Sequence, residues 1–285
     1  MTASVLYDVP GPRARRRNRV YGVLSALAVL ALLAFVLYRL DDTGQFQGGL
    51  WEAYEYTQTH ERIVDGLLTT LRTFALAAAF SLVLGALLAA GRLSDHRPVR
   101  WAASVVVEFF RAMPLLIMIF LLSAAVFTTE PMWALVCGLT LYNGSVQAEI
   151  FRSGINAVPK GQSEAAYALG LRKTQVMANV LVPQAVRTML PSIISQLVVT
   201  LKDTSLGFII LYEELLFVGK SFAEQSRPVH GVYAFIPMVI VFGSIYILLC
   251  LALSGLARWA ERRTQRSRPG SSGARAAGTA AGLSS

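Results

Sequence analysis

The sequence predicts an all-α membrane protein with six transmembrane helices. Of its 285 residues, 54% are hydrophobic and only 15% are charged, whereas a soluble domain typically carries about 25% charged residues. The mean hydropathy is +0.52, and the apolar residues gather in runs that reach the length of about 20 residues needed by a spanning helix. These runs are continuous and do not alternate, which favours helices over the strands of a closed barrel.

The six predicted spans follow one another along the chain. They cover residues 20–40, about 66–90, part of 101–127, about 132–150, about 189–211 and about 233–259. The first run is long for the core of a signal peptide, and Tyr38-Arg39-Leu40-Asp41 is a poor small-residue cleavage site, so we expect a retained helix. Residues 1–19 form a basic tail before it, and residues 260–285 form a tail that is expected to be disordered.

The distribution of charge predicts the orientation of the spans. The net charge is +9, and the excess lies largely in arginines at the two ends, namely Arg13, Arg15, Arg16, Arg17, Arg19, Arg258, Arg262, Arg263, Arg266 and Arg268. By the positive-inside rule, both termini lie in the cytoplasm together with the basic loops 92–100 and 152–187. The acidic loop 41–65 and the loops 128–131 and 213–230 lie outside. Basic flanks beside apolar spans indicate membrane lipid as a partner and exclude nucleic acid, for which the spans leave little surface.

Several kinds of site are excluded by what the sequence lacks. Cys137 and Cys250 both lie in apolar runs and form neither a disulfide framework nor a metal motif. The three histidines all fall in loops, so Ser145 has no base to activate it within the spans, which argues against an intramembrane enzyme. No G-x-x-x-x-G-K-[ST] loop is present, so any ATP must be bound by a separate subunit. The chain is therefore predicted not to be an enzyme and to hold no metal.

The third apolar run carries two charges that a simple span would not tolerate. Glu108 and Arg111 stand three residues apart on one helix face, with Pro114 just after them. Because a charge at the centre of a bilayer is costly, we expect residues 97–110 to lie partly in the cytoplasmic interface as an amphipathic elbow. Spanning would then begin near Arg111, with Pro114 tolerated in a first helical turn.

Between the fourth and fifth runs lies a mostly polar, helix-prone segment, residues 159–183. Pro159 breaks the preceding helix, Ser163 can cap a new one, and Glu164 in its first turn suits the helix dipole. Ala165 and Ala166 favour helix, and Gly170 is a good residue for the position just past its end. The pattern predicts a helix of about two turns outside the membrane, whose small residues let another protein approach closely.

This segment resembles the EAA loop of ABC importer permeases, and further motifs extend the resemblance over about residues 66–259. They are Phe109-Phe110-Arg111-Ala112-Met113-Pro114-Leu115-Leu116, Ala148-Glu149-Ile150-Phe151-Arg152-Ser153-Gly154-Ile155, Leu181-Val182-Pro183-Gln184-Ala185-Val186-Arg187, Leu190-Pro191 and Lys202-Asp203-Thr204-Ser205-Leu206. Together they are similar to the type I permeases of polar amino acid importers, the histidine, glutamine and glutamate class. The opening stretch, residues 5–13, and the extra first span resemble the larger glutamate-uptake permease of high-GC Gram-positive bacteria.

The resemblance implies a five-helix importer core with an added N-terminal helix, in the plasma membrane. It implies a permease subunit that imports L-glutamate, with glutamine or another polar amino acid as the alternative substrate. A secondary transporter is a distant alternative for the class of protein. The implied partners are an ABC ATPase dimer, a second permease forming a heterodimer or a homodimer, and an extracellular amino acid-binding protein. ATP and Mg²⁺ would sit on the ATPase, and this chain would bind no cofactor. The residues that would contact the ATPase are Gly161, Glu164, Ala165, Ala166 and Gly170.

Polar residues inside the spans are candidates for the substrate path or its gate. They are Arg111, Asn143, Gln147, Lys202, Asp203, Thr204 and Ser205. Buried ions within a membrane must pair or face water, so Lys202 and Asp203 either line the path or form an internal ion-pair network with each other or with an arginine. Asn143, Ser145 and Gln147 either contact the amino acid or hydrogen-bond across helices, at about 1 kcal/mol each.

Overall fold

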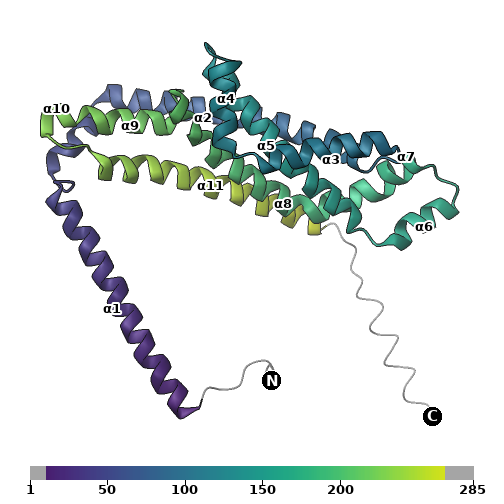
Figure 1. Ribbon diagram of the computed structural model, residues 1–285, viewed down its shortest axis with the longest axis horizontal. Helices are drawn as coiled ribbons and strands as arrows, with labels where there is room; N and C mark the ends of the chain where they lie inside the picture. The colour runs from purple at the N-terminus through teal and green to yellow at the C-terminus, as the bar shows by residue number, and fades with distance from the viewer. Residues whose placement is uncertain (1–10, 267–285) are drawn as a thin grey trace. The chain divides into compact units, whose positions relative to one another are not determined.

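The computed structural model describes residues 11–266, and every regular element in that range is helical (Figure 1). Residues 1–10 and 267–285 lie outside the described residues, and with them most of the tail that the sequence predicts to be disordered. The chain divides into two compact units, which are described separately. Among the described residues, one comprises residues 11–56 and 222–238, and the other comprises residues 57–221 and 239–266.

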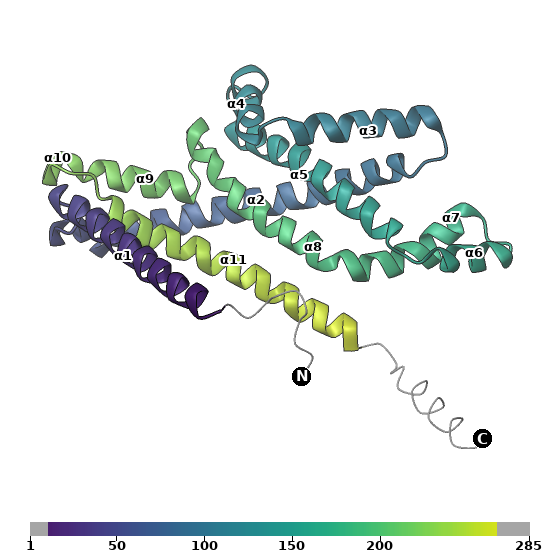
Figure 2. The same cartoon turned by 60° about the horizontal axis from the view of Figure 1, so that its bottom comes forward.

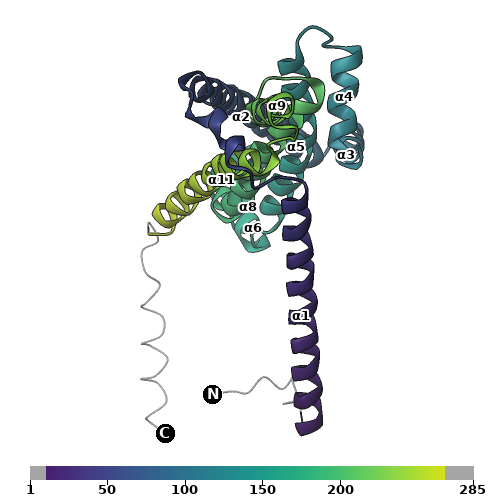
Figure 3. The same cartoon turned by 90° about the vertical axis from the view of Figure 1, so that its left-hand side faces the viewer.

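The first unit is built around the predicted first span. Helix α1 (Pro12–Asp42) begins with proline in its first turn and continues as one long helix, without a buried residue (Figure 3). The short 3₁₀ helix η1 (Gly48–Glu55) follows, and helix α10 (Arg227–His230) comes from the later segment. Gln45 joins the two segments, because its Nε2 donates to the Tyr233 carbonyl at 2.9 Å and its Oε1 accepts from the Ile236 amide at 3.3 Å.

The second unit holds the packed helices α2 (Thr57–Arg92), α5 (Pro131–Asn156) and α8 (Val182–Asp203) (Figure 2). Helices α2 and α5 approach closely at Gly85, where an added Cβ would lie 2.7 Å from the Gln147 Cβ and 3.0 Å from the Gly144 carbonyl oxygen. Small residues at crossings let membrane helices gain van der Waals contact. A core of Ala77, Ile119 and Leu135 joins α2 and α5 to helix α4 (Leu115–Ala125).

The third run forms a bent pair of helices, as the sequence predicts. Helix α3 (Arg97–Ala112) and helix α4 meet at an angle of 97°, with Pro114 at the N-cap of α4 (Figure 2). The helix expected to span from Arg111 is shorter than the prediction implied. The 11 residues of α4 rise only about 16 Å, which is too little to cross a hydrocarbon core of about 30 Å. Any third span is therefore a broken one that uses both helices.

A long, nearly continuous helical rod runs from residue 173 to residue 210. It consists of α7 (Lys173–Val176), the π-helical turn η2 (Met177–Leu181), α8 and the 3₁₀ helix η3 (Thr204–Ile210). Helix α6 (Lys160–Ala168) precedes the rod at one end, and helix α9 (Leu215–Gln225) follows at the other (Figure 2). At 1.5 Å per residue the rod is about 57 Å long, so it connects the two ends of this unit.

The apolar helices account for the predicted spans. Within the described residues, α1, α2, the rod and α11 (Phe235–Arg266) are each long and apolar enough to cross a membrane, and the α3–α4 pair supplies a fifth candidate. Helix α5, 26 residues long, carries the remaining predicted span, and its buried polar residues lower its hydropathy. One boundary is corrected: α11 continues to Arg266, so residues 260–266 of the tail are helical, because they are mostly good helix formers.

Candidate functional site

The helix predicted between the fourth and fifth spans is present as α6, but its start differs. The helix begins at Lys160, directly after Pro159 at the N-cap. Ser163, expected as the cap, lies inside the helix, where its Oγ donates to the Lys160 carbonyl at 2.8 Å. The prediction of a serine cap is therefore wrong. Pro159 already sets the start of the helix, because it lacks an N–H and its backbone lies where the extended chain changes to helix.

Gly170 ends this helix as its position predicts. Its φ is +78°, in the left-handed region that favours glycine. The Gly170 amide donates to the Tyr167 carbonyl at 2.9 Å, and the Leu171 amide donates to the Ala166 carbonyl at 3.2 Å. This pair of bonds is a Schellman motif, which satisfies carbonyls at the helix end and turns the chain sharply. The end of helix α6 is thus fixed by hydrogen bonds within its own segment.

One face of α6 packs on its own chain and the rest is open. Ala166 is 5% exposed, whereas Gly161, Glu164 and Ala165 are exposed. Tyr167 and Leu169, at 48% and 83% exposure, present large apolar side chains from the same helix and its cap. Clustered exposed apolar residues mark a surface for a partner. The sequence alone does not distinguish these two residues, because their exposure depends on how α6 packs.

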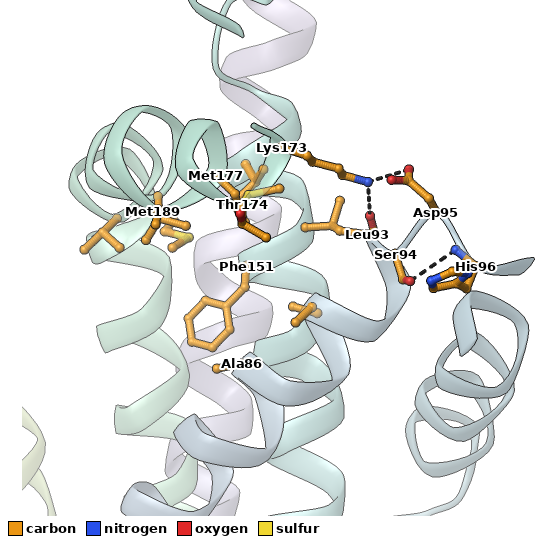
Figure 4. Close-up of a pocket in the computed structure, with 16 residues that line it drawn as sticks. Ala86, Leu93, Ser94, Asp95, His96, Phe151, Lys173, Thr174, Met177 and Met189 are labelled. Atoms are coloured by element: carbon orange, nitrogen blue, oxygen red, sulfur yellow. Dashed lines mark hydrogen bonds and ion pairs between the residues drawn. The ribbon is translucent and has the colours of Figure 1, made fainter. Parts of the chain in front are cut away.

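The chain after α6 is tied to the turn between α2 and α3. Lys173 Nζ donates to the Leu93 carbonyl at 3.3 Å and forms an ion pair with Asp95 (Figure 4). The hydrogen bond from Lys173, followed by its charge, lowers the pKa of Asp95 below its ordinary value of 3.8. Because the pKa is lowered, the stabilising contribution of this pair is present above pH 3.8 and is lost only as the pH falls through the lowered value. The contact is therefore constant over neutral pH.

A cavity of about 790 Å³ lies below this contact. Its walls come from α2, α5 and the α7–α8 part of the rod, and they are mostly apolar, with Ala86, Phe151 and Met189 pointing into it (Figure 4). The π-helical turn η2 forms part of its wall through Met177. A π turn interrupts the regular i→i−4 hydrogen-bond pattern of a helix, and the cavity leaves empty space beside η2. The start of the rod therefore has room to shift relative to α2 and α5.

Replacing Lys173 with methionine is expected to loosen the segment that carries α6. The substitution removes the ion pair and the bond to Leu93, so amide hydrogen exchange across residues 160–172 should rise about two- to fivefold, a modest effect because exposed ion pairs contribute little. Exchange within α8 should not change. Lys160→Met is the control, since it removes an equal charge from α6 without removing this contact. Equal exchange in the two variants would contradict the role of Lys173.

A charged cluster connects α2, α3 and α5. Arg92 Nη1 lies 2.8 Å from Glu149 and its Nη2 lies 3.5 Å from Glu108, while Arg152 also pairs with Glu149. Arg111 lies 3.4 Å from Glu108, its neighbour one turn earlier on α3. Arg111, a candidate for the substrate path, thus belongs to a group that holds the elbow against α2 and α5. The sequence pattern showed only the Glu108–Arg111 spacing, because the other partners come from distant positions in the chain.

The polar residues of α5 face α8. Asn143 and Gln147 are fully buried; the Asn143 Oδ1 accepts from Gln196 Nε2 at 2.7 Å, and Gln147 Nε2 donates to the Ile193 carbonyl at 3.4 Å. Ser145 donates to the Leu141 carbonyl of its own helix. Of the two readings left open by the sequence, these contacts favour hydrogen bonds across helices. Gln147 Oε1 is buried without a partner among the described residues.

The group from Lys202 to Ser205 stands where α8 changes to the 3₁₀ helix η3. Thr204 Oγ1 donates to the Leu201 carbonyl at 2.6 Å, and Ser205 Oγ donates to the Lys202 carbonyl at 2.7 Å. Within the described part of the chain, neither Lys202 nor Asp203 forms an ion pair, so these contacts do not support the internal network, which is one of the two readings that the sequence leaves open. Lys202 is exposed and Asp203 is half-buried, so both side chains remain accessible at the surface of α8.

The sequence of these elements matches the model of a known family. A model of the family described as "Binding-protein-dependent transport system inner membrane component" matches residues 81–266, which include the α6 segment and the rod. The chain belongs to this family of permeases. It is a multi-pass membrane protein, and the resemblance drawn from its motifs is confirmed.

Relatives of this permease include transporters of several amino acids. The glutamate transport system permease protein GluD of Corynebacterium glutamicum is 40% identical over 237 residues, covering 80% of this chain and 85% of that protein. The arginine transport system permease protein ArtQ of Bacillus subtilis is 30% identical over 206 residues, covering 70% and 91%. The glutamate/aspartate import permease GltK of Escherichia coli is 28% identical over 214 residues, covering 71% and 93%.

Solved structures show the same fold. A chain from the crystal structure of an amino acid ABC transporter with histidines superposes with a TM-score of 0.64 at 28% identity, covering 72% of this permease and 95% of that chain. An inward-facing methionine ABC transporter, MetNI, gives a TM-score of 0.61 at 18% identity, covering 73% and 98%. At that identity the second likeness concerns the fold alone. Both likenesses fit the all-helical type I importer fold that the sequence predicts.

Proposed function

We propose that this permease is the transmembrane subunit of an ATP-driven importer whose substrate is L-glutamate. The observation that carries the importer mechanism is α6, an exposed helix that ends in a Schellman turn and stands at one end of the rod. The choice of glutamate is supported by the 40% identity to a glutamate permease over 80% of the chain. Glutamine or another polar amino acid is the alternative, since relatives that carry arginine or glutamine are 30% identical.

In this proposal α6 is the coupling helix that docks on the ATPase. Gly161, Glu164, Ala165, Ala166 and Gly170 form the contact region, and we include Tyr167 and Leu169 in it because their side chains are exposed beside these residues. ATP and Mg²⁺ belong to the ATPase dimer, and this chain binds neither. When the ATPase closes, α6 moves, and the displacement passes along the rod toward η3. The import cycle is then a population shift between two arrangements of packed helices.

The orientation follows from the distribution of arginines. Both termini and α6 would face the cytoplasm, and η1, α9 and α10 would face outward, where an amino acid-binding protein delivers the substrate. The charged cluster around Arg92 and Glu149 would then hold the elbow α3 near the cytoplasmic headgroups. Lipid phosphates there attract basic residues, which agrees with membrane lipid as a partner.

We further propose that the pore forms between this chain and a second, shorter permease, with a homodimer as the alternative. A pore shared by two subunits needs a partner across a twofold or pseudo-twofold axis. Helix α1 buries no residue within its own unit, and the five-helix core is complete without it, which supports a peripheral position. Purification of the tagged chain from its own membrane tests this assembly. A second permease that is recovered with the chain would support the heterodimer, and recovery of the chain without one would favour the homodimer.

Uptake in a deletion strain tests the substrate. Removing the gene should reduce uptake of labelled L-glutamate at least tenfold, and the restored gene should recover it, since an importer without one of its permeases has no pore. Labelled glutamine and arginine, measured in the same cells, are the controls. A strain that keeps glutamate uptake but loses uptake of glutamine or arginine would overturn the choice of glutamate while leaving the importer mechanism standing.

A further inference from the structure

Glu214 is a buried carboxylate at the end of the rod that lies opposite α6. Among the acidic and basic residues whose side chains the structure describes, only Glu214 is fully buried. It stands between the 3₁₀ helix η3, which ends the rod at Ile210, and helix α9, which begins at Leu215. Burying a carboxylate is costly unless hydrogen bonds replace its water, so its partners show which elements it joins.

Three donors from two helices meet the Glu214 carboxylate. The Phe217 amide donates to Oε1 at 2.9 Å and the Leu216 amide donates to Oε2 at 2.8 Å, so the two oxygens cap the first turn of α9. The Tyr246 hydroxyl of α11 donates to the same Oε2 at 2.7 Å. The carboxylate thus links the start of α9 to a residue 32 positions further along the chain.

The start of α9 is also held against α2 and α11. The Leu215 amide donates to Thr70 Oγ1 on α2 at 3.0 Å. An added Cβ at Gly66 of α2 would lie 3.3 Å from the Leu215 Cα, so the two helices approach at the level of their backbones. An added Cβ at Gly219 of α9 would lie 2.7 Å from the Phe242 ring of α11. The first turns of α9 therefore pack tightly on both neighbours (Figure 1).

The end of the rod reaches Glu214 through a tight turn. An added Cβ at Gly207 in η3 would lie 3.2 Å from the Glu214 Cγ, so the rod packs directly against this side chain. Between them, Leu211 has φ +58°, a strained conformation for a residue other than glycine. The Tyr212 amide donates to the Gly207 carbonyl at 3.0 Å, and its hydroxyl lies 2.9 Å from that of Thr73 on α2. The connection from the rod to α9 is therefore fixed by contacts along its whole length.

We propose that Glu214 is a positioning residue for import, which transmits movement of the rod to α9, α2 and α11. The proposal rests on the proposed role of α6, because a displacement that enters the rod there reaches η3 and then Glu214. Coupling between distant sites travels through packed side chains, hydrogen bonds and rigid elements. Glu214 does not line the neighbouring cavity of about 560 Å³, which Arg72 and Glu213 border, so it acts through the helices that it joins.

The role requires a carboxylate rather than any side chain of this length. Both oxygens of a carboxylate accept hydrogen bonds, whereas glutamine has one accepting oxygen and a nitrogen that only donates. In either orientation of a Glu214→Gln amide, the nitrogen faces a backbone N–H of α9, so one bond of the cap is lost. Tyr246→Phe is more selective, because it removes the bond to α11 and leaves the cap of α9 complete.

Uptake and ATP hydrolysis, measured on the same samples, test this role. The permease is reconstituted in vesicles with its ATPase and binding protein, and labelled L-glutamate is supplied. Glu214→Gln should lower the uptake per ATP hydrolysed about tenfold and Tyr246→Phe about threefold, because each removes bonds from a buried network. ATP hydrolysis should stay within about twofold of the wild type, since α6 is unchanged. The maximal rate of uptake should fall while KM does not change, because Glu214 acts through other residues.

Two further variants sharpen the comparison. Glu130→Gln is the matched control, because Glu130 is an exposed glutamate at the start of α5 in the same unit, and its uptake per ATP should equal that of the wild type. Glu214→Gln combined with Tyr246→Phe should be no worse than Glu214→Gln alone, because the two side chains act through one bond.

The possible outcomes separate this inference from the proposed function. Uptake and ATP hydrolysis that fall in equal proportion would show a purely structural role and overturn the inference. Uptake per ATP at the wild-type level in either Glu214→Gln or Tyr246→Phe would also overturn it, as would effects that multiply in the combined variant. Wild-type vesicles that hydrolyse ATP but import none of labelled glutamate, glutamine and arginine would instead overturn the proposed function.

Discussion

Replacing Gly170 with tryptophan is expected to abolish uptake while leaving the permease in the membrane. The position has φ +78° and no atom within 4 Å of an added Cβ, so the indole would project from the end of α6 onto the surface proposed to meet the ATPase. The left-handed conformation adds a strain of about 1–3 kcal/mol, which would disturb the Schellman turn. Uptake of labelled substrate and ATPase activity, measured on the same membranes, would show both effects.

Two variants separate bulk from strain. Gly170→Ala introduces the strain without the bulk and should retain part of the uptake. Gly231→Trp is the matched control, because Gly231 also has a positive φ, +75°, and also has no atom within 4 Å of an added Cβ, but it caps α10 in the other unit. Transport by Gly170→Trp at the level of Gly231→Trp would contradict the assignment of α6 as the coupling helix.

Replacing Gly85 with leucine is expected to destabilise the core of the second unit. An added Cβ would lie 2.7 Å from the Gln147 Cβ, 3.0 Å from the Gly144 carbonyl oxygen and 3.2 Å from the Ala148 amide nitrogen, so α2 and α5 would have to separate. Overpacking of this kind costs about 3 kcal/mol or more when backbone must move. The loss would lower the midpoint of thermal unfolding by about 6–12 °C for a domain of this size, measured on purified protein.

Gly255→Leu provides the comparison. Gly255 lies inside α11 and has nothing within 4 Å of an added Cβ, so leucine there gains helix propensity without a clash. Its midpoint should be unchanged or slightly higher. A Gly85→Leu protein as stable as Gly255→Leu would mean that α2 and α5 do not pack closely at this point.

Local sequence signals predicted most of the helices well, because each signal acts on its own neighbourhood. The apolar runs predicted α1, α2, α5, the part of the rod from residue 189 onward and α11, and the charges near Pro114 predicted the break between α3 and α4. Gly170 was identified as a helix terminator because left-handed backbone favours glycine wherever the helix packs. Pro159 likewise marked a boundary through its missing N–H. The family followed from such local motifs.

Errors arose where two local signals compete. Ser163 and Pro159 both suit a helix start, and the proline prevails because it cannot be accommodated inside a helix, whereas a serine hydroxyl can turn back to a carbonyl within the helix. An ion pair between Lys202 and Asp203, one of the two readings that the sequence leaves open, is absent from the described part of the chain. Residues adjacent in a helix point in different directions, so neighbouring opposite charges do not face each other.

The sequence by itself determined the class of the protein, the order of its helices and the segment that marks it as a permease, because hydropathy, charge and turn chemistry depend on near neighbours. Only the tertiary structure decided which polar residues meet. It brought Arg92 to Glu149 and Asn143 to Gln196, and it placed Arg72 and Glu213 in the lining of one cavity. Contacts between residues far apart in the chain depend on helix rotation and crossing, which no single segment encodes.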